Sequence, residues 1–368
     1  MKRAVPFTIL LLAICVAACL PAQAEDEVLS YGDFAYILKD GGAIIEGYVG
    51  ELSDDLFIPS EIDGYAVTGI GFAAFECRDG LTGVAIPDSV TSIGDSAFWG
   101  CSGLTGMTIS EHVTSIGKNP FAFCSLTHIE VSSANPAYTQ NDGILFDKHQ
   151  QSLLSYPAGR EGAYTIPEGV LHIGDAAFEG CRGLNGVTIP DSVTSIGEEA
   201  FYACSGLTSV TIPDSVTCVG AHAFDQCSGL TSVVIPNGVT TIGNCAFYGC
   251  DGLTGIAIPS SVTNIGFYAF AGCSGLTDVT IPAGVAYVDA GVFYECSGLT
   301  SVALPDSVTS IGQRAFEGCS SLSTLAVPAN VTTIEEFAFN DCVNLTLKVV
   351  EGSFAERYAQ ENGIPYTH

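Results

Sequence analysis

Residues 184–206 read LNGVTIPDSVTSIGEEAFYACSG, and residues 207–229 read LTSVTIPDSVTCVGAHAFDQCSG. The two stretches are consecutive copies of one 23-residue unit, and further copies begin at Leu230, Leu253, Leu276 and Leu299. A fixed period of this length predicts coils that stack into a single elongated solenoid with a continuous core. The period therefore overrides the two or three globular domains that 368 residues would ordinarily indicate.

The copy that begins at Leu207 shows how one coil is expected to fold. Val210 and Ile212 are two residues apart on a short strand, so both point to the same, inner face. Pro213 ends the strand because it has no N–H to continue a β-ladder. We expect Val216 and Val219 to line the return path. The unit thus predicts one short strand per coil and a parallel sheet of about 10–11 strands in a mainly β repeat solenoid.

A glycine column follows the return path, for example at Gly220, and it suits a turn that needs a positive φ. The column is replaced by Asp289 and Glu335 near the end of the repeats. On this interpretation Asp289 is tolerated and Glu335 is strained or shifted.

Phenylalanine and cysteine columns close each coil, and they form eleven pairs from Phe75/Cys77 to Phe339/Cys342. We interpret the cysteine column as a ladder of buried thiols, because small apolar Cys packs well in a row, with disulfides between adjacent coils as the alternative. Cys218 and Cys245 stand outside the column.

The ends and one interruption depart from the unit. Residues 25–64 are predicted to form an N-terminal β cap with two strands around a turn at residues 40–42, and residues 346–368 a C-terminal cap with a short helix that starts at Ser353. Between them, residues 65–345 form the solenoid. Residues 133–164 break the period, and we expect an inserted hairpin or an enlarged coil there, either as a tolerated loop or as a projection that binds a partner.

Residues 1–24 have the composition of an export signal, with Lys2 and Arg3 before an apolar stretch. We favour signal-peptide cleavage after Ala24, and cleavage that leaves a lipid-anchored Cys19 is the alternative. Removing this segment leaves 9 Lys and Arg against 40 Asp and Glu, a formal charge of −31. Such an acidic chain disfavours nucleic acids and anionic membranes as partners, since both require a basic surface. No second apolar stretch predicts a transmembrane segment.

The sequence has no pattern that indicates catalysis, a cofactor or a metal. Its six histidines form no HExxH pair, and GxSxG, P-loop and GxGxxG patterns are missing. The acids that follow the strand-ending prolines, such as Asp191 and Asp214, are interpreted as turn formers. We therefore predict a non-enzymatic protein without a cofactor.

The outward positions of the predicted strands are mostly Ser, Thr, Gly and Ala. Polar exceptions and the interruption supply the candidate contacts for a ligand, which are His128, Glu130, Lys148, His149, Ser209, Thr211, Ser232 and Asp278.

The unit resembles the BspA-like, or treponemal, class of leucine-rich repeat. Leu184, Val187, Ile189, Pro190, Val193, Ile196, Gly197, Ala200, Phe201 and Cys204 carry the match. The resemblance implies a curved, right-handed leucine-rich-repeat solenoid and an exported bacterial surface or secreted protein. Some members act as adhesins, so host extracellular-matrix proteins or bacterial surface proteins are the expected partners. A passive surface spacer without a specific ligand is the alternative.

Overall fold

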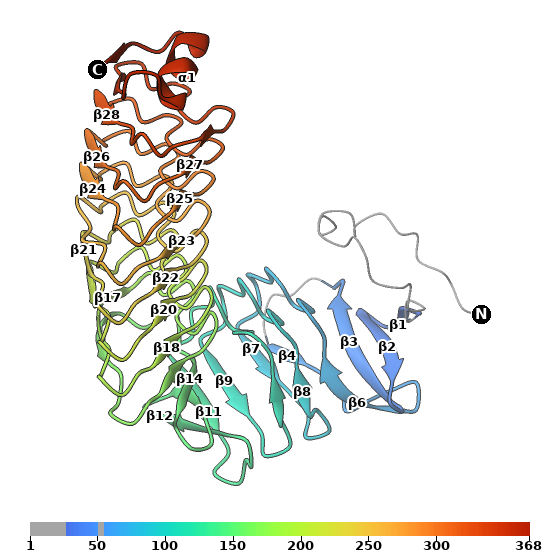
Figure 1. The fold of residues 1–368 in the computed structure, drawn as a ribbon. Helices are drawn as coiled ribbons and strands as arrows, with labels where there is room; N and C mark the ends of the chain where they lie inside the picture. Colours follow the sequence, from blue (N-terminus) through green and yellow to red (C-terminus); the bar gives the residue numbers. More distant parts are fainter. Residues whose placement is uncertain (1–26, 51–54) are drawn as a thin grey trace.

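The computed structural model describes residues 27–50 and 55–368, so the predicted export signal with Cys19 and Ala24 lies outside the described residues. The described chain is a mainly β solenoid in which equivalent strands recur every 23 residues, which confirms the predicted fold class. The coils are arranged in two arms that meet at an angle, so the molecule is L-shaped (Figure 1).

Each coil contributes a short strand to a first face, at the position that the repeat predicts. These strands are β4 (Asp55–Phe57), β7 (Gly83–Ala85), β9 (Gly106–Ile109), β11 (His128–Val131), β15 (Gly162–Thr165), β17 (Leu184–Thr188), β19 (Ser209–Thr211), β21 (Ser232–Val234), β24 (Asp278–Thr280), β26 (Ser301–Ala303), β28 (Thr324–Ala326) and β30 (Thr346–Lys348). Ala257 continues the row through a single bridge to Val234. The row extends into both predicted caps, at β4 and β30.

The return path of each coil, for which the sequence predicted no strand, carries a second face of two-residue strands. Val219, for example, lies in β20 and pairs in parallel with Ile196 and Ile242 of the neighbouring coils. The strands of this face are β8 (Ser92–Ile93), β10 (Ser115–Ile116), β16 (His172–Ile173), β18 (Ser195–Ile196), β20 (Cys218–Val219), β22 (Thr241–Ile242), β23 (Asn264–Ile265), β25 (Tyr287–Val288), β27 (Ser310–Ile311) and β29 (Thr333–Ile334). Parallel ladders on two faces therefore join runs of neighbouring coils.

The caps contain the predicted elements. At the N-terminus, β1 (Leu29–Tyr31), β2 (Phe34–Lys39) and β3 (Gly42–Tyr48) form an antiparallel meander, which β6 (Tyr65–Ile70) joins in parallel, with β5 (Glu61–Ile62) on β6. At the C-terminus, Ser353 caps α1 (Phe354–Asn362) by accepting a hydrogen bond from the Glu356 N–H. Gly363 ends the helix in the left-handed conformation, and β31 (Tyr366–Thr367) then pairs with β30.

The phenylalanine column forms a buried stack of rings through the solenoid. In the second arm the ring centroids lie 4.7 Å apart for Phe178 and Phe201 and 5.8 Å apart for Phe270 and Phe293, with the ring planes nearly parallel. Tyr156 begins this stack below Phe178, and Tyr358 of α1 covers its far end at Phe339. Stacked rings add about 0.5–1.5 kcal/mol per pair to the burial of their area, so the stack couples each coil to its neighbours.

The cysteine column is buried as predicted and has an additional role. Cys227 illustrates it, because its thiol donates a hydrogen bond of 3.1 Å to the carbonyl of Phe201 in the preceding coil. Burial raises the pKa of Cys227 well above its usual value, which keeps the group a thiol and therefore a donor. The Phe201 carbonyl also accepts a hydrogen bond of 3.2 Å from the Cys204 N–H, so the thiol supplies a second hydrogen bond that links this backbone group to the next coil.

Cys77 does not belong to the column, contrary to the expectation from sequence. It is exposed and has a φ of 54°. Arg78 takes the column position instead, and its guanidinium donates to the carbonyl of Tyr48. Tyr48 is the ring that precedes Phe75 in the stack, so the arginine replaces the thiol as donor in the first coil.

The glycine column has a different cause from the predicted one. Gly220 has no positive φ, but a Cβ built on it would lie 2.6 Å from the carbonyl oxygen of Gly197. The left-handed residues come two and six positions later, as at His222 and Gln226. Glu335 likewise has no positive φ and accepts a hydrogen bond from the Gln313 N–H, so the predicted strain is wrong. Glycine predominates in this column because most successive coils approach one another backbone to backbone, and Asp289 and Glu335 are the exceptions.

The interruption at 133–164 contains the inserted hairpin that the sequence predicted, and it forms the corner piece between the arms. It forms β12 (Tyr138–Asn141), β13 (Ile144–Asp147) and β14 (Ser152–Ser155), and β14 pairs in parallel with β16. The hydrophobic core divides into two clusters here, with Leu145 in the first arm and Ile144 and Phe146 in the second. All three side chains are fully buried, so alternate residues of β13 join the two cores.

The close approach at the glycine column yields a test with an internal control. Gly220→Ala places a methyl group against the Gly197 carbonyl, and we expect a loss of about 1–3 kcal/mol in unfolding free energy, as for other overpacking substitutions. Gly255→Ala is the control, because its Cβ would meet nothing within 4 Å and its φ is not positive. Urea unfolding followed by circular dichroism measures both. Equal stability of the two variants would show that the column has another cause.

Candidate functional site

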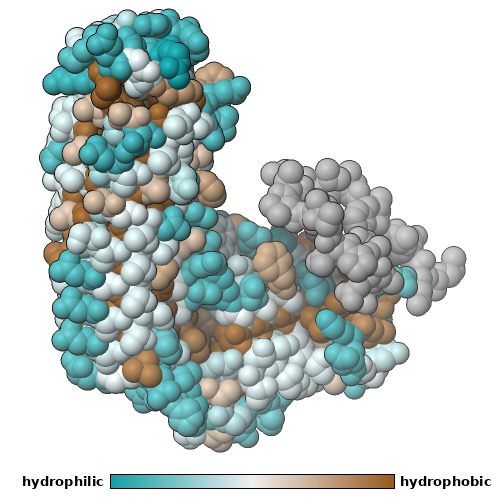
Figure 2. All heavy atoms as spheres, in the orientation of Figure 1, coloured by the Kyte–Doolittle hydropathy of each residue, from teal (hydrophilic) through white to brown (hydrophobic). Residues whose placement is uncertain are grey.

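Four of the candidate contacts lie on the first face of the second arm. Ser209 and Thr211 of β19 are exposed, and Ser209 pairs in register with the exposed Ser232 of β21. Asp278 of β24 is also exposed, but the coil of Ala257 separates it from β21. This face offers hydroxyl groups on a flat sheet, and the visible surface of the second arm is mostly pale or hydrophilic (Figure 2).

The other four candidates are divided between two places. His128 and Glu130 are exposed on β11, at the end of the first arm. Lys148 and His149 are exposed in the turn between β13 and β14, where the Lys148 ammonium donates to the carbonyl of Asn135. The eight predicted residues therefore do not form one site, and whether any of them contacts a ligand stays a prediction.

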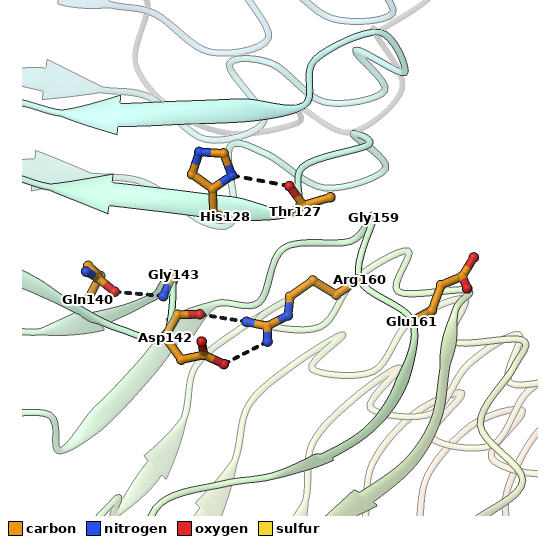
Figure 3. A pocket seen from close by; sticks show the side chains of 8 residues that line it. All are labelled: Thr127, His128, Gln140, Asp142, Gly143, Gly159, Arg160 and Glu161. Carbon is orange, nitrogen blue, oxygen red and sulfur yellow. Dashed lines mark hydrogen bonds and ion pairs between the residues drawn. The ribbon is translucent and has the colours of Figure 1, made fainter.

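An open hollow of about 670 Å³ lies where the first face is interrupted between β11 and β15 (Figure 3). Two turns of the corner piece and the Thr127–His128 segment form its walls, with Thr127, His128, Gln140, Asp142, Gly143, Gly159, Arg160 and Glu161 lining it. Among the lining residues, sequence had indicated His128 alone.

The polar groups of the hollow largely satisfy one another. The Arg160 guanidinium donates to the carbonyl oxygen of Asp142 at 2.6 Å and to its carboxylate at 2.7 Å. The same guanidinium lies over the Tyr156 ring, 5.5 Å from its centroid. Thr127 Oγ1 lies 3.2 Å from His128 Nδ1. An open hollow whose arginine is already paired with Asp142 suits contact with polar groups of a larger partner better than enclosure of a small molecule.

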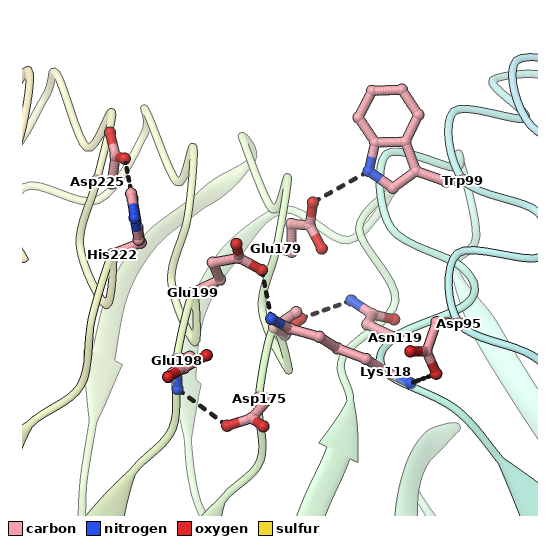
Figure 4. A network of polar contacts seen from close by, with 11 residues as sticks. Asp95, Trp99, Lys118, Asn119, Asp175, Glu179, Glu198, Glu199, His222 and Asp225 are labelled. Atoms are coloured by element: carbon pink, nitrogen blue, oxygen red, sulfur yellow. Dashed lines mark hydrogen bonds and ion pairs between the residues drawn. The ribbon is translucent and has the colours of Figure 1, made fainter. Parts of the chain in front are cut away.

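A polar network joins the two arms on the inner side of the angle (Figure 4). Lys118 of the first arm forms a 2.7 Å ion pair with Glu199 of the second, and the Trp99 indole N–H donates to Glu179 at 3.0 Å. Behind them the buried Asn119 donates to the Ala176 carbonyl at 2.6 Å and accepts from Ser155 at 2.7 Å. We call these contacts the inner corner.

Aromatic side chains pack around the inner corner, and further aromatic side chains lie along the second arm. Phe123 of the first arm packs edge-on against Trp99 and Tyr202, with centroids 4.9 and 6.4 Å away. Three coils further on, Phe267 is 51% exposed, and Tyr268 packs edge-on against Tyr294 with centroids 6.0 Å apart. Sequence reasoning missed these residues because it examined the outward positions of the strands and not those of the turns after the glycine column.

Burial perturbs two carboxylates of this region. Desolvation raises the pKa of Glu179, against the opposing effects of the Trp99 hydrogen bond and Lys118. Desolvation also raises the pKa of Asp225, although His222 Nδ1 lies 2.7 Å from its Oδ2. Perturbed acids at an interface between packed segments are common without catalysis, and both belong to the contacts of the turns.

Across residues 27–50 and 55–368, no three His, Cys, Asp or Glu side chains are grouped to hold a metal ion. Within the same ranges, no helix is both long and apolar enough to traverse a lipid bilayer.

Comparison with known families identifies the repeat. A family model described as BspA type leucine rich repeat region matches six copies, over residues 65–142, 162–277 and 240–356. No curated protein matches the chain significantly.

Solved structures share the fold over most of the chain. A leucine rich cell surface protein from Faecalibacterium prausnitzii is 31% identical, with 92% of this chain and 97% of that chain covered and a TM-score of 0.54. A leucine-rich repeat protein from Eubacterium ventriosum is 25% identical over 84% of this chain and 93% of that chain, with a TM-score of 0.53. The pneumococcal vaccine antigen PcpA, 15% identical over 93% and 98% with a TM-score of 0.51, shows the fold alone.

The inner corner can be tested with Trp99, which is the single tryptophan of the chain. Because the pKa of Glu179 is raised, the carboxylate beside the indole takes up a proton at a higher pH than an ordinary glutamate, and we expect Trp99 emission to titrate with a midpoint above about 4.5. Glu179→Gln should abolish this transition. It should also be less destabilised than the wild type as the pH rises to 7, since a raised folded-state pKa contributes stability only at low pH. An unchanged titration in the variant would assign it to another group.

Proposed function

Because this chain belongs to the BspA-type leucine-rich repeat family, we propose that it is an exported bacterial surface protein that recognises other proteins and acts as an adhesin. The observation that carries this proposal is the 31% identity, over 92% of the chain, to a protein described as a leucine rich cell surface protein. The coarser statement, that the fold is a protein-recognition scaffold, follows from the family itself. Host extracellular-matrix proteins and bacterial surface proteins are the proposed partners.

The physical form of the molecule supports recognition over catalysis. The residues that recur from coil to coil form the ring stack, the thiol ladder and the glycine contacts. The outward columns take no part in these contacts and can therefore vary. A long surface of this kind binds a macromolecule through many contacts, of which a few supply most of the affinity. The solenoid is typically a non-enzymatic scaffold, and we propose that this chain is one.

Export is the part of the proposal that rests on residues 1–24. Their composition supports cleavage after Ala24, with a lipidated Cys19 as the alternative. The mass of the mature N-terminus in a native host distinguishes a free chain that starts at Glu25 from a lipid-anchored one.

A passive spacer is the second candidate, and the small Ser, Thr and Ala side chains on the first face of the second arm favour it. Such a surface has none of the large anchors that dominate protein interfaces.

Binding to a defined panel decides between the two. We expect the purified chain from residue 25 to bind at least one immobilised matrix protein (fibronectin, laminin or collagen) or one species of co-resident bacterium saturably, with Kd below about 10 µM, which is ordinary for a specific interface. Heat-unfolded protein at the same concentration is the control for adhesion of the bare acidic chain. No saturable binding to any member at about 100 µM would favour the spacer.

A further inference from the structure

An aromatic patch lies on the turns of the second arm, and no contact with the first arm explains it. We define the aromatic patch as Phe267, Tyr268 and Tyr294. Phe267 is 51% exposed, and the two tyrosines are partly exposed. Tyr268 lies flat against the next coil, where a Cβ on Gly291 would be 2.3 Å from its ring. The rings are therefore held in place by the backbone and not by a covering segment.

The aromatic patch faces the same way as the inner corner. The 23-residue period places Tyr268 in the column of Glu199 and Tyr294 in the column of Glu179. Those two glutamates contact the first arm through Lys118 and Trp99. A segment bound to the patch consequently lies on the inner side of the angle between the arms (Figure 1).

Within the chain, an arginine in one of these columns contacts both an aromatic ring and a carboxylate. In the coil after Tyr294, the Arg314 guanidinium lies over the Phe337 ring at 5.4 Å from its centroid and 3.4 Å from the Glu317 carboxylate. At the corner, Arg182 lies over Phe123 at 5.3 Å. A ring and a carboxylate around one guanidinium is a favourable arrangement, because cation–π attraction and charge pairing act on the same group.

The aromatic patch also combines rings with a carboxylate, although Glu295 lies one position after the column of Glu317, which Tyr294 occupies. Glu295 follows Tyr294 directly, and a hydrogen bond to that carboxylate, together with its negative charge, raises the pKa of the Tyr294 hydroxyl. Glu295 is exposed, with a left-handed φ of 55° that turns the chain outward. Arg314, whose positive charge opposes this rise in the pKa of Tyr294, makes its ring contact with Phe337.

From this geometry we infer that the aromatic patch and Glu295 bind an arginine side chain of a partner protein. The guanidinium stacks on the exposed rings and pairs with the Glu295 carboxylate, as Arg314 does with Phe337 and Glu317. Arginine fits better than lysine because its planar group stacks on a ring and binds a carboxylate through two N–H groups at once. The excess of 40 acids over 11 basic residues favours the approach of such a cationic segment. The inference rests on the proposed recognition function and names the chemistry of its partner.

The test uses three fluorescein-labelled nine-residue peptides of Gly and Ser with two Arg, two Lys or two citrulline residues. Citrulline keeps the shape of arginine without its charge. We expect the chain from residue 25 to bind the Arg peptide in fluorescence anisotropy at 150 mM salt, the Lys peptide several-fold more weakly, and the citrulline peptide at background. Tyr294→Ser and Glu295→Gln should each weaken binding of the Arg peptide about fivefold, within the range of one cation–π or ion-pair contact.

Two matched substitutions control for the loss of a ring and of a charge elsewhere. Tyr287→Ser removes a 59% exposed tyrosine from the second face, and Asp214→Asn removes an exposed acid from the turn that follows β19. Both should change the affinity less than twofold, and thermal unfolding confirms that all four variants remain folded. Equal weakening by variants and controls would reduce the effect to non-specific charge attraction and overturn the inference. Arg and citrulline peptides binding alike, or no saturable binding at about 1 mM, would overturn it too.

The panel experiment tests the proposed function separately from the inference about the aromatic patch. If a panel partner binds the Tyr294→Ser variant as tightly as the wild type, the recognition function is supported and the aromatic patch is not its binding site. If no panel member binds, the proposed recognition function is contradicted, whatever the affinity of the peptides.

Discussion

The backbone-to-backbone approach of successive coils is the constraint on which the rest of the structure depends. A methyl group at Gly220 would lie 2.6 Å from the carbonyl oxygen of Gly197, and the same closeness recurs at Gly243 and Gly266. At this separation phenylalanine rings of neighbouring coils stack, and the cysteine thiols reach the carbonyls of the coil before. A single 23-residue coil cannot offset its own ordering entropy, so these contacts between coils supply the stability that repetition makes possible.

The repeated part of the fold was predictable from sequence because each buried column recurs in register. The Phe and Cys columns, the strand before each proline and the helical cap at Ser353 all follow from residue types at fixed spacing. The second face was missed because two-residue strands leave little periodicity to detect. The cause of the glycine column was missed because close approach between coils and a positive φ select the same residue, and only the structure distinguishes them.

The angle between the arms and the surfaces around it were not predictable in the same way. Residues 144–146 look like an ordinary apolar strand, and only the two core clusters reveal that alternate side chains enter different arms. The contacts of Trp99 with Glu179 and of Lys118 with Glu199 join positions 80 and 81 residues apart that no repeat relates. In a straight solenoid the turns after the glycine column would form one uniform edge. Because the arms meet at an angle, these turns lie on the inner side of a corner, and the large aromatic side chains of the inner corner and the aromatic patch lie on them. The flat first face, which carries Ser209 and Ser232, supplies no comparable anchors.

The break in the repeat is a structural joint that unites two cores, and hydrogen exchange of β13 tests this role most directly. We expect the amides of Ile144, Leu145 and Phe146 to exchange as slowly as those of the central coils around β18 and β20, because all three side chains are buried and the strand is paired on both sides. Exchange within seconds, as in a projecting loop, would contradict this role.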